Sequence, residues 1–370
     1  MLKRAVIGIT LILILLVSGC RLVYIFHAAA GQYRLLHDSI QVEDALKSDS
    51  LDPDHKGRLN LVALIKDFGE KELGLKRTQN YQTVYLKSRQ PPIYTVSASP
   101  KDRLVRISWW FPVVGNMPYL GFFNLESARK EKDRLVEKGL DVSTGVAEAY
   151  STLGWFKDPV TLNLLEGSIV DLTETILHEM THTTLYIKGQ GEFNEGLANL
   201  VGKAGAIFFF KKTYGYTHPF TIEAENNLTD ERIFSSFLGS LLENLERVYN
   251  SDLSYMEKLD KREKIFKKSL KEFAGIKIRF KADRFRHFGE SGLNNAYLMS
   301  VGLYNRHFQL FESLLTKKDN SIRKMFIFFR DMTDEGGDIL ERIKTQLISC
   351  GHFKENGYKT QVDQQAYNII

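Results

Sequence analysis

The stretch His178-Glu179-Met180-Thr181-His182, with Glu195 thirteen residues later inside Phe193-Asn194-Glu195-Gly196-Leu197-Ala198, decides how this chain is interpreted. An α-helix turns by about 100° per residue, so the two histidines lie about 40° apart on one face and can bind one ion together. Zinc prefers a tetrahedral set of nitrogen and oxygen ligands, and a catalytic site leaves one position for water. Three protein ligands are therefore expected: His178, His182 and Glu195.

Glu179 follows the first histidine directly, which rotates it off the line of ligands but keeps it within reach of a zinc-bound water. It is placed to act as the general base that takes a proton from that water. The alternative is a degenerate scaffold without metal, in which both histidines are hydrogen-bonded core residues. That alternative leaves Glu195 unexplained.

Two helices are predicted around this motif. Apolar residues at helical spacing and the capping pair Ser168 and Asp171 predict a helix over residues 168–188, with Gly189 as its C-terminal stop. A second helix is expected to begin near Phe193 and to hold Glu195 in its first turn.

The sequence Asn-Glu-Gly-Leu-Ala after an H-E-x-x-H helix is similar to the third-ligand motif of gluzincin metallopeptidases. More narrowly, residues 109–202 resemble the bacterial "predicted aminopeptidase" family of zinc lipoproteins. Besides the two predicted helices, the resemblance is carried by Trp110–Gly115, Pro118–Phe123 and Ala149–Pro159, and it extends more weakly from Gly31-Gln32-Tyr33 to Asn294-Asn295-Ala296.

The resemblance implies a mainly helical, zincin-like α+β metallopeptidase that holds one zinc ion per chain. His178, His182 and Glu195 match the family's ligand positions, and Glu179 matches its catalytic base. Gln190 departs from the family's pattern, in which an acidic residue is common at this position. The resemblance therefore implies no role for the loop around Gln190.

The N-terminus predicts a lipoprotein signal. Lys3 and Arg4 precede an apolar run of thirteen residues, which is short for a membrane span of about 20 residues, and Val17-Ser18-Gly19-Cys20 resembles a lipobox. Cleavage would leave Cys20 as an acylated first residue on the membrane, with the globular part outside the cytoplasm. An ordinary secretory signal with a chance cysteine is the alternative.

Composition limits the other function classes. The chain has 370 residues, 43% of them hydrophobic, and a net charge of +5, which is too small to indicate a nucleic-acid partner. Cys350 is the only other cysteine, so no intramolecular disulfide is expected once Cys20 is modified. Basic residues between Lys258 and Lys271, Arg262 among them, alternate with acidic ones and predict a solvated helix face. The sequence does not indicate an oligomeric state.

After the signal peptide at residues 1–19, the chain is predicted to divide into three parts. Residues 20–80 form an N-terminal helical segment, residues 81–160 a β-containing subdomain, and residues 161–370 a helical zinc-binding domain. One small sheet is expected from strands at residues 81–86, 93–96, 104–111 and 140–146. Helices are expected at residues 233–248, 266–273, 293–303, 308–315, 322–329 and 339–347.

Peptide hydrolysis also requires groups that hold the substrate and stabilise the oxyanion. Residues 149–156 are the candidate substrate strand, with a buried connector as the equal alternative. Tyr304 is the preferred oxyanion donor, with a packing role as the alternative for it and for the other tyrosines. The competing candidates are Tyr150, Tyr186 and His307.

Other polar residues are candidates for secondary roles. Asn199, one helical turn after Glu195, is a candidate to orient a ligand side chain. Glu148 or Asp158 could bind a free substrate amine, whereas an endopeptidase would need an open groove instead.

The sequence therefore predicts a membrane-anchored zinc metallopeptidase, of an aminopeptidase-like kind, that acts on peptide substrates in the cell envelope, on the periplasmic side if two membranes are present. The alternative is a non-catalytic lipoprotein that uses the same fold for binding or envelope assembly. The presence of Glu179 favours the enzyme, because a binding module has no need of a general base.

Overall fold

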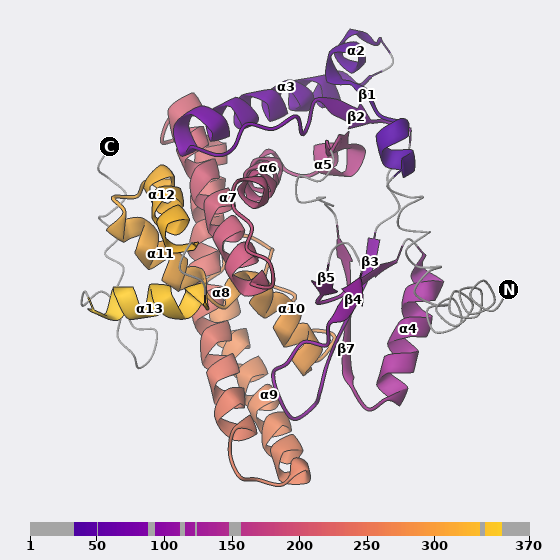
Figure 1. Cartoon of the computed structure of the whole chain (residues 1–370), viewed down its shortest axis with the longest axis vertical. Coiled ribbons are helices and arrows are strands. Elements are labelled where there is room, and N and C mark those ends of the chain that lie inside the picture. Colours follow the sequence, from indigo (N-terminus) through magenta and orange to yellow (C-terminus); the bar gives the residue numbers. More distant parts are fainter. Residues whose placement is uncertain are drawn as a thin grey trace, which may run out of the picture.

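The computed structural model describes residues 33–49, 51–87, 93–111, 115–122, 124–147, 157–333 and 337–349. Within these ranges the chain is mainly helical with small sheets, as the α+β prediction required (Figure 1). Among the described residues, no helix has both the length and the apolar character needed to cross a membrane.

Two helices at the centre of the molecule carry His178, His182 and Glu195. Helix α6 spans Ile169–Thr184 and begins where the predicted cap lies, because the Ser168 hydroxyl accepts a hydrogen bond from the Asp171 backbone at 3.0 Å. Its apolar face is buried. Helix α7 spans Gly191–Tyr214, so Glu195 is its fifth residue and lies in the second turn rather than the first.

Helix α6 ends four residues earlier than predicted, since Leu185 is already extended. The Asn194 side chain explains this difference: its amide binds both the N–H and the C=O of Ile187, at 2.9 and 2.8 Å. These bonds hold residues 185–190 as a turn against α7. Gly189, with φ of +83°, lies inside that turn instead of ending the helix.

Helix α3 (Pro53–Phe68) lies across α6 and starts with Asp52 as its cap (Figure 1). Before it come α2 (Val42–Lys47) and strand β1 (Ile40–Gln41), and after it a π-helical turn over Gly69–Leu73. Strand β1 pairs antiparallel with β2 (Thr83–Tyr85), which pairs parallel with β8 (Val160–Thr161).

In the part of the chain that the structure describes, the strands form three small sheets rather than the one sheet expected. In the second sheet, β3 (Ile93–Ser99) lies between β6 (Leu120–Phe122) and β7 (Asp141–Ala147), antiparallel to both. The third sheet is the hairpin of β4 (Trp109–Phe111) and β5 (Gly115–Met117). The strand predicted from residue 104 begins only at Trp109.

The second sheet, which contains β3 and β7, packs between two helices: α4 (Leu125–Glu137) lies on one side and α10 (Asn295–Asn305) on the other (Figure 1). Helix α4 was not predicted because only two of its residues, Ala128 and Leu135, are buried and its charged residues obscure that narrow apolar face. The short helix α5 (Leu162–Glu166) was also missed.

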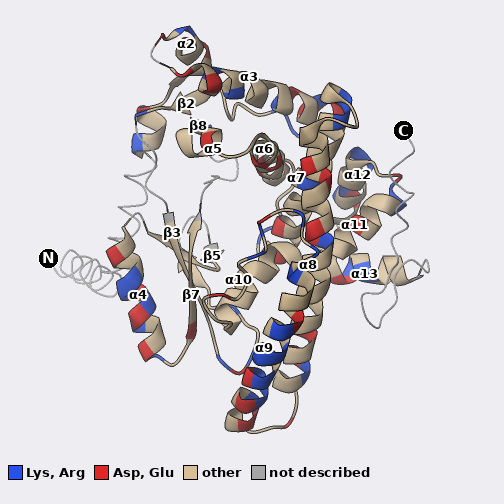
Figure 2. Cartoon of the chain, turned by 180° about the vertical axis from the view of Figure 1, so that it is seen from behind, with Lys and Arg blue, Asp and Glu red and all other residues tan. Residues whose placement is uncertain are grey.

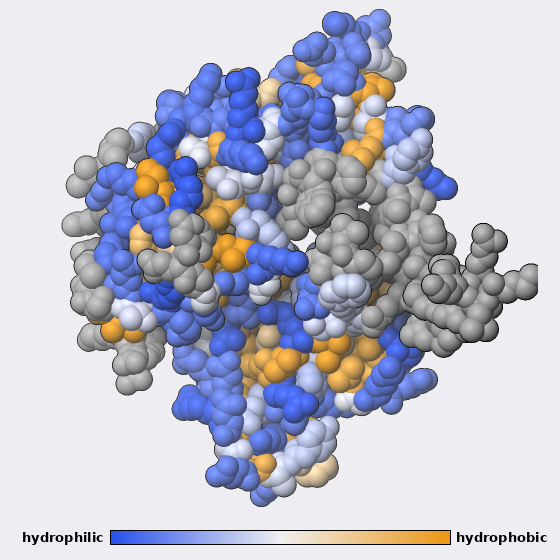
Figure 3. Space-filling view, viewed as in Figure 1, coloured by the Kyte–Doolittle hydropathy of each residue, from blue (hydrophilic) through white to orange (hydrophobic). Residues whose placement is uncertain are grey.

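The remaining helices lie where helices were predicted, although the first two begin 14 and 11 residues before the predicted ranges. Helices α8 (Pro219–Tyr249) and α9 (Tyr255–Lys277) form an antiparallel pair with a turn at Ser251, and α11 (Phe308–Lys317), α12 (Ile322–Thr333) and α13 (Ile339–Ser349) complete the C-terminal part. Helix α9 alternates basic and acidic residues on its outer face (Figure 2), with pairs such as Lys264 and Asp260 at 2.6 Å. The face seen in Figure 3 is mainly hydrophilic, with several apolar patches.

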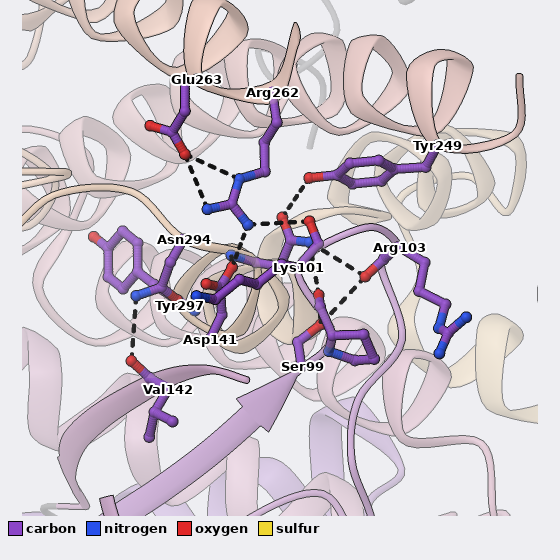
Figure 4. Close-up of polar contacts among 12 residues, drawn as sticks. Ser99, Lys101, Arg103, Asp141, Val142, Tyr249, Arg262, Glu263, Asn294 and Tyr297 are labelled. Atoms are coloured by element: carbon purple, nitrogen blue, oxygen red, sulfur yellow. Dashed lines mark hydrogen bonds and ion pairs between the residues drawn. The ribbon is translucent and has the colours of Figure 1, made fainter. Parts of the chain in front are cut away.

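Arg262 departs from the predicted solvated face of α9. Its side chain is buried and donates to Asp141 Oδ2 at 2.8 Å and to the Lys101 carbonyl at 3.0 Å (Figure 4). Asp141 also accepts the backbone N–H of Asn295 at 2.9 Å. This cluster ties α9, the start of β7 and the start of α10 together.

Candidate metal centre

Three side chains from α6 and α7 converge on one point. The Nε2 atoms of His178 and His182 lie 3.1 Å apart, and Glu195 Oε2 lies 3.3 Å from the first and 3.5 Å from the second. Within the described ranges, these residues form the one group of three or more His, Cys, Asp or Glu side chains that could hold a metal ion.

The spacing of these donor atoms fits a zinc ion. Ligands about 2.0–2.1 Å from a tetrahedral zinc ion are about 3.3–3.4 Å from one another. The three observed separations of 3.1, 3.3 and 3.5 Å cover this value. Two imidazole nitrogens and a carboxylate oxygen are also a donor set that zinc accepts, with a fourth position left for a reacting molecule.

Helical periodicity places polar residues in two facing rows. Glu174, His178 and His182 follow one another at intervals of four residues along α6, and Glu195, Asn199 and Lys203 do so along α7. The antiparallel helices pair Glu195 with the histidines at one end. At the other end, Lys203 Nζ lies 3.1 Å from Glu174 Oε2.

Gly202 allows the two rows to come this close. A Cβ atom on Gly202 would lie 2.7 Å from the backbone oxygen of Glu174 and 3.4 Å from His178 Cβ. A side chain there would therefore force α7 away from α6. The glycine sets the distance across which Glu195 meets the histidines.

Glu179 has a carboxylate oxygen without a partner. Its Oε2 atom is buried and makes no hydrogen bond within the described part of the protein, while the side chain as a whole is only half-buried. Glu179 also acts electrostatically on both His182 and Tyr304. An uncommitted carboxylate beside the ligand cluster is what a general base requires.

The cluster is strongly coupled electrostatically. Burial by itself would raise the pKa of Glu195, but the hydrogen bonds from His178 and His182 outweigh it and hold that pKa well below its ordinary value. Burial lowers the pKa of His182, but Glu195 and Glu179 raise it by more. Opposed shifts of this kind are common at functional sites.

Two of the tyrosines considered as oxyanion donors border the cluster. The ring centre of Tyr304 lies 6.2 Å from that of His178, and the ring centre of Tyr186 lies 6.3 Å from that of His182. The charge of Glu195, followed by burial, raises the pKa of Tyr304 well above its ordinary value. Burial and then Glu195 raise the pKa of Tyr186. Both phenols therefore stay protonated and can donate hydrogen bonds.

His307, the third described candidate, has another partner. Its Nε2 atom lies 2.8 Å from Glu192 Oε2, and the other oxygen of Glu192 accepts from Arg106 at 2.9 Å. Burial would raise the pKa of Glu192, but these two partners hold it at about 2. No local pattern marks Arg106. Glu192 could have been found from the sequence as an acidic residue in the first turn of a helix, where a carboxylate is favoured.

Asn199 does not orient a ligand in the way the sequence suggested. Its Nδ2 atom donates to Glu231 Oε1 and to the backbone oxygen of Tyr304, each at 3.2 Å. Helix α8 supplies Glu231, a partner that lies 32 residues further along the chain. No local pattern identifies it.

Tyr81 is another residue that the sequence did not single out. Its φ of +64° is unusual for a bulky residue, and its backbone N–H donates to the Asp158 carbonyl at 2.8 Å. Burial, then the charges of Glu179 and Asp158, raise the pKa of Tyr81 well above its ordinary value. Asp158 is itself buried, which does not suit a group that meets a substrate amine from solvent.

The family model described as "Putative aminopeptidase" matches residues 23–337. The chain belongs to this family. The match includes His178, His182, Glu195, Glu179 and Tyr304, and it confirms the resemblance to an aminopeptidase family. Membership points to peptide hydrolysis as the activity of the chain. No curated protein and no solved structure matches the chain.

Several predicted features lie outside the described residues. These are the signal peptide at residues 1–19 with Cys20, the candidate substrate strand at residues 149–156 with Tyr150, and also Glu148 and Cys350.

Proposed function

We propose that this member of the family is a zinc-dependent peptidase. The observation that carries the proposal is the triangle of donor atoms from His178, His182 and Glu195, whose sides of 3.1 to 3.5 Å match a tetrahedral zinc site. Glu179, with an unpaired carboxylate oxygen beside that triangle, supports hydrolysis rather than a purely structural metal.

A zinc ion bound there would polarise the scissile carbonyl and lower the pKa of the attacking water toward about 7. Glu179 takes the proton of that water and later delivers it to the leaving amine, so that one carboxylate serves both steps. The Tyr304 hydroxyl, which is protonated near neutral pH like any phenol, donates a hydrogen bond to the carbonyl oxygen as negative charge develops.

We further propose that the protein acts from the membrane surface. Acylation of Cys20 after removal of residues 1–19 would hold the chain on the bilayer, with its helical part in the cell envelope outside the cytoplasm. Its substrates would then be peptides in the cell envelope. Its family points to release of N-terminal residues.

The decisive experiment compares the full chain in detergent with its Glu179→Gln variant. The native protein should bind one zinc ion and cleave members of a peptide library. Glu179→Gln should keep the zinc but lower kcat/KM by about 10² to 10⁴, the usual contribution of a general base. Glu126→Gln removes an exposed carboxylate on α4 and should change neither property.

The outcomes separate the enzyme from the binding lipoprotein. His178→Ala should lose zinc and activity together, because it removes one of three ligands. If the native protein binds zinc but cleaves no peptide, or if Glu179→Gln keeps full activity, the peptidase proposal fails. The non-catalytic role in binding or envelope assembly is then favoured.

A further inference from the structure

Asn199 connects the metal-ligand helix to the tyrosine beside the site. It lies one turn after Glu195 on α7, and its Nδ2 atom donates to Glu231 Oε1 and to the backbone oxygen of Tyr304, each at 3.2 Å. An amide nitrogen has two hydrogens, so each acceptor receives one. Because both neighbours are acceptors, the amide has to present its nitrogen to them.

The position of Tyr304 in α10 explains why this contact matters. Tyr304 is the tenth of the eleven residues of α10. The last four carbonyls of a helix have no partner within the helix, so they need one from elsewhere. Asn199 supplies that partner from α7 and therefore caps the turn that carries the tyrosine.

Glu231 holds the Asn199 side chain in this orientation. Glu231 is buried on α8, and its Oε2 atom lies 3.4 Å from Lys203 Nζ. Lys203 is equally buried and also pairs with Glu174 on α6 at 3.1 Å. The polar contacts thus run from α6 through α7 and α8 to the C-terminal turn of α10.

The other end of α10 is fixed separately. The backbone N–H of Asn295 donates to Asp141 at 2.9 Å, Arg262 donates to the same carboxylate, and the Tyr249 hydroxyl donates to Asn295 Oδ1 at 2.8 Å (Figure 4). The start of α10 is therefore bound to β7, α8 and α9. Its last turn is bound to α7 through Asn199.

We propose that Asn199 is a positioning residue, which holds Tyr304 at the metal-ligand cluster by tying its backbone carbonyl to Glu231. This inference rests on the proposed function for the role of Tyr304. It predicts that Asn199 contributes to the reaction through Tyr304 and not through zinc binding.

A double-mutant cycle on the full chain tests this inference. Tyr304→Phe should lower kcat by about 100-fold, as removal of an oxyanion donor does. Asn199→Ala should lower kcat by about tenfold, with KM changed less than about twofold and the zinc content unchanged. In the Tyr304→Phe background, Asn199→Ala should lower kcat by less than about twofold, because the group that it positions is already gone.

Asn227→Ala is the matched control. Asn227 donates its Nδ2 to Glu174 Oε1 at 3.2 Å in the same buried network but does not bind the Tyr304 carbonyl. Any effect that it has should be equal in both backgrounds. Equal effects of Asn199→Ala in both backgrounds, or no effect in the native one, would overturn the inference. A Tyr304→Phe variant with native kcat also overturns it and leaves the zinc and Glu179 proposal intact.

Hydrogen exchange provides a measurement that does not depend on activity. Asn199→Ala should speed amide exchange in the last turn of α10, residues 302–306, while exchange at the start of that helix stays as in the native protein. Unchanged exchange in that turn contradicts the positioning role even if the protein proves not to be a peptidase. Loss of activity in Glu179→Gln tests the proposed function separately.

Discussion

Substitution of Gly202 by alanine should weaken zinc binding although residue 202 touches no ligand atom of the candidate site. The added Cβ would lie 2.7 Å from the Glu174 backbone oxygen. Relief of this contact to an ordinary separation of 3.4 Å requires α7 to move by about 0.7 Å relative to α6. Metal-ligand distances tolerate only about 0.2 Å, so a helix shift of that size would pull Glu195 out of range of the histidines.

The expected magnitudes follow from two opposing effects. Overpacking costs about 1–3 kcal/mol of folding stability, whereas alanine gains about 1 kcal/mol over glycine inside a helix. The metal-free Gly202→Ala variant should therefore lose between about 0 and 2 kcal/mol. Its zinc affinity should fall by roughly 10-fold to 100-fold, the usual effect of disturbing the support of a metal ligand.

Gly57→Ala is the control for this experiment. Gly57 lies inside α3, and a Cβ there meets nothing within 4 Å. That variant should gain up to about 1 kcal/mol and bind zinc as the native protein does. Urea unfolding of the metal-free proteins and competition with a chromophoric chelator measure the two quantities. If Gly202→Ala is as stable as Gly57→Ala and binds zinc with native affinity, the close approach of α6 and α7 does not set the geometry of the site.

Three further predictions concern buried charges. The pKa of Glu192 is held at about 2 in the folded chain, below its ordinary 4.5. The roughly 3 kcal/mol by which ionised Glu192 stabilises the fold is therefore present above pH 4.5 and is lost as the pH falls toward 2. In urea unfolding, the Glu192→Gln variant should lose less unfolding free energy between pH 4.5 and 2 than the native protein. The same loss in both proteins would contradict the lowered pKa of Glu192. Lys203→Met removes the cation that pairs with the buried Glu231, whereas Glu174 keeps Arg284 at 3.0 Å, and the change should cost about 3–5 kcal/mol. Glu231→Gln should restore part of this loss in the double variant, and a single Lys203→Met variant as stable as the native chain would show that the lysine does not compensate the Glu231 carboxylate. Arg262→Met leaves the buried Asp141 unpaired and should lower the unfolding free energy by a similar amount, whereas Lys264→Met on the exposed face of α9 should change it by less than about 1 kcal/mol.

Local periodicity was sufficient for most of the helices. The C-terminal helices and the α8 and α9 pair were predicted because apolar residues recur at helical spacing and face a common core. The same rule failed for α4, which buries only Ala128 and Leu135. The four predicted strands correspond to β2, β3, β4 and β7, but β1, β5, β6 and β8 were missed, since strands of two or three residues contain too few residues for an alternation to be visible.

The early end of α6 shows where neighbouring elements override local preference. Apolar and helix-compatible residues continue past Thr184, but the Asn194 side chain from α7 binds the backbone of Ile187 and holds the segment as a turn. That turn determines how α7 returns along α6. The position of Glu195 against the histidines depends on it.

The sequence by itself determined the two histidines and the adjacent glutamate, because residues one and four positions apart on a helix have a fixed spatial relation. The sequence also indicated Glu195. A short turn after the first helix brings the start of the next helix, which holds Glu195, back beside the end of the first helix, where the histidines lie. Tertiary structure alone decided the partners of these residues: Asn199 with the Tyr304 carbonyl, Glu192 with His307, and Arg262 with Asp141 are separated by 105, 115 and 121 positions. Contacts between such distant residues follow from how whole helices pack, and the packing depends on every buried side chain and on glycines such as Gly202 rather than on any local pattern.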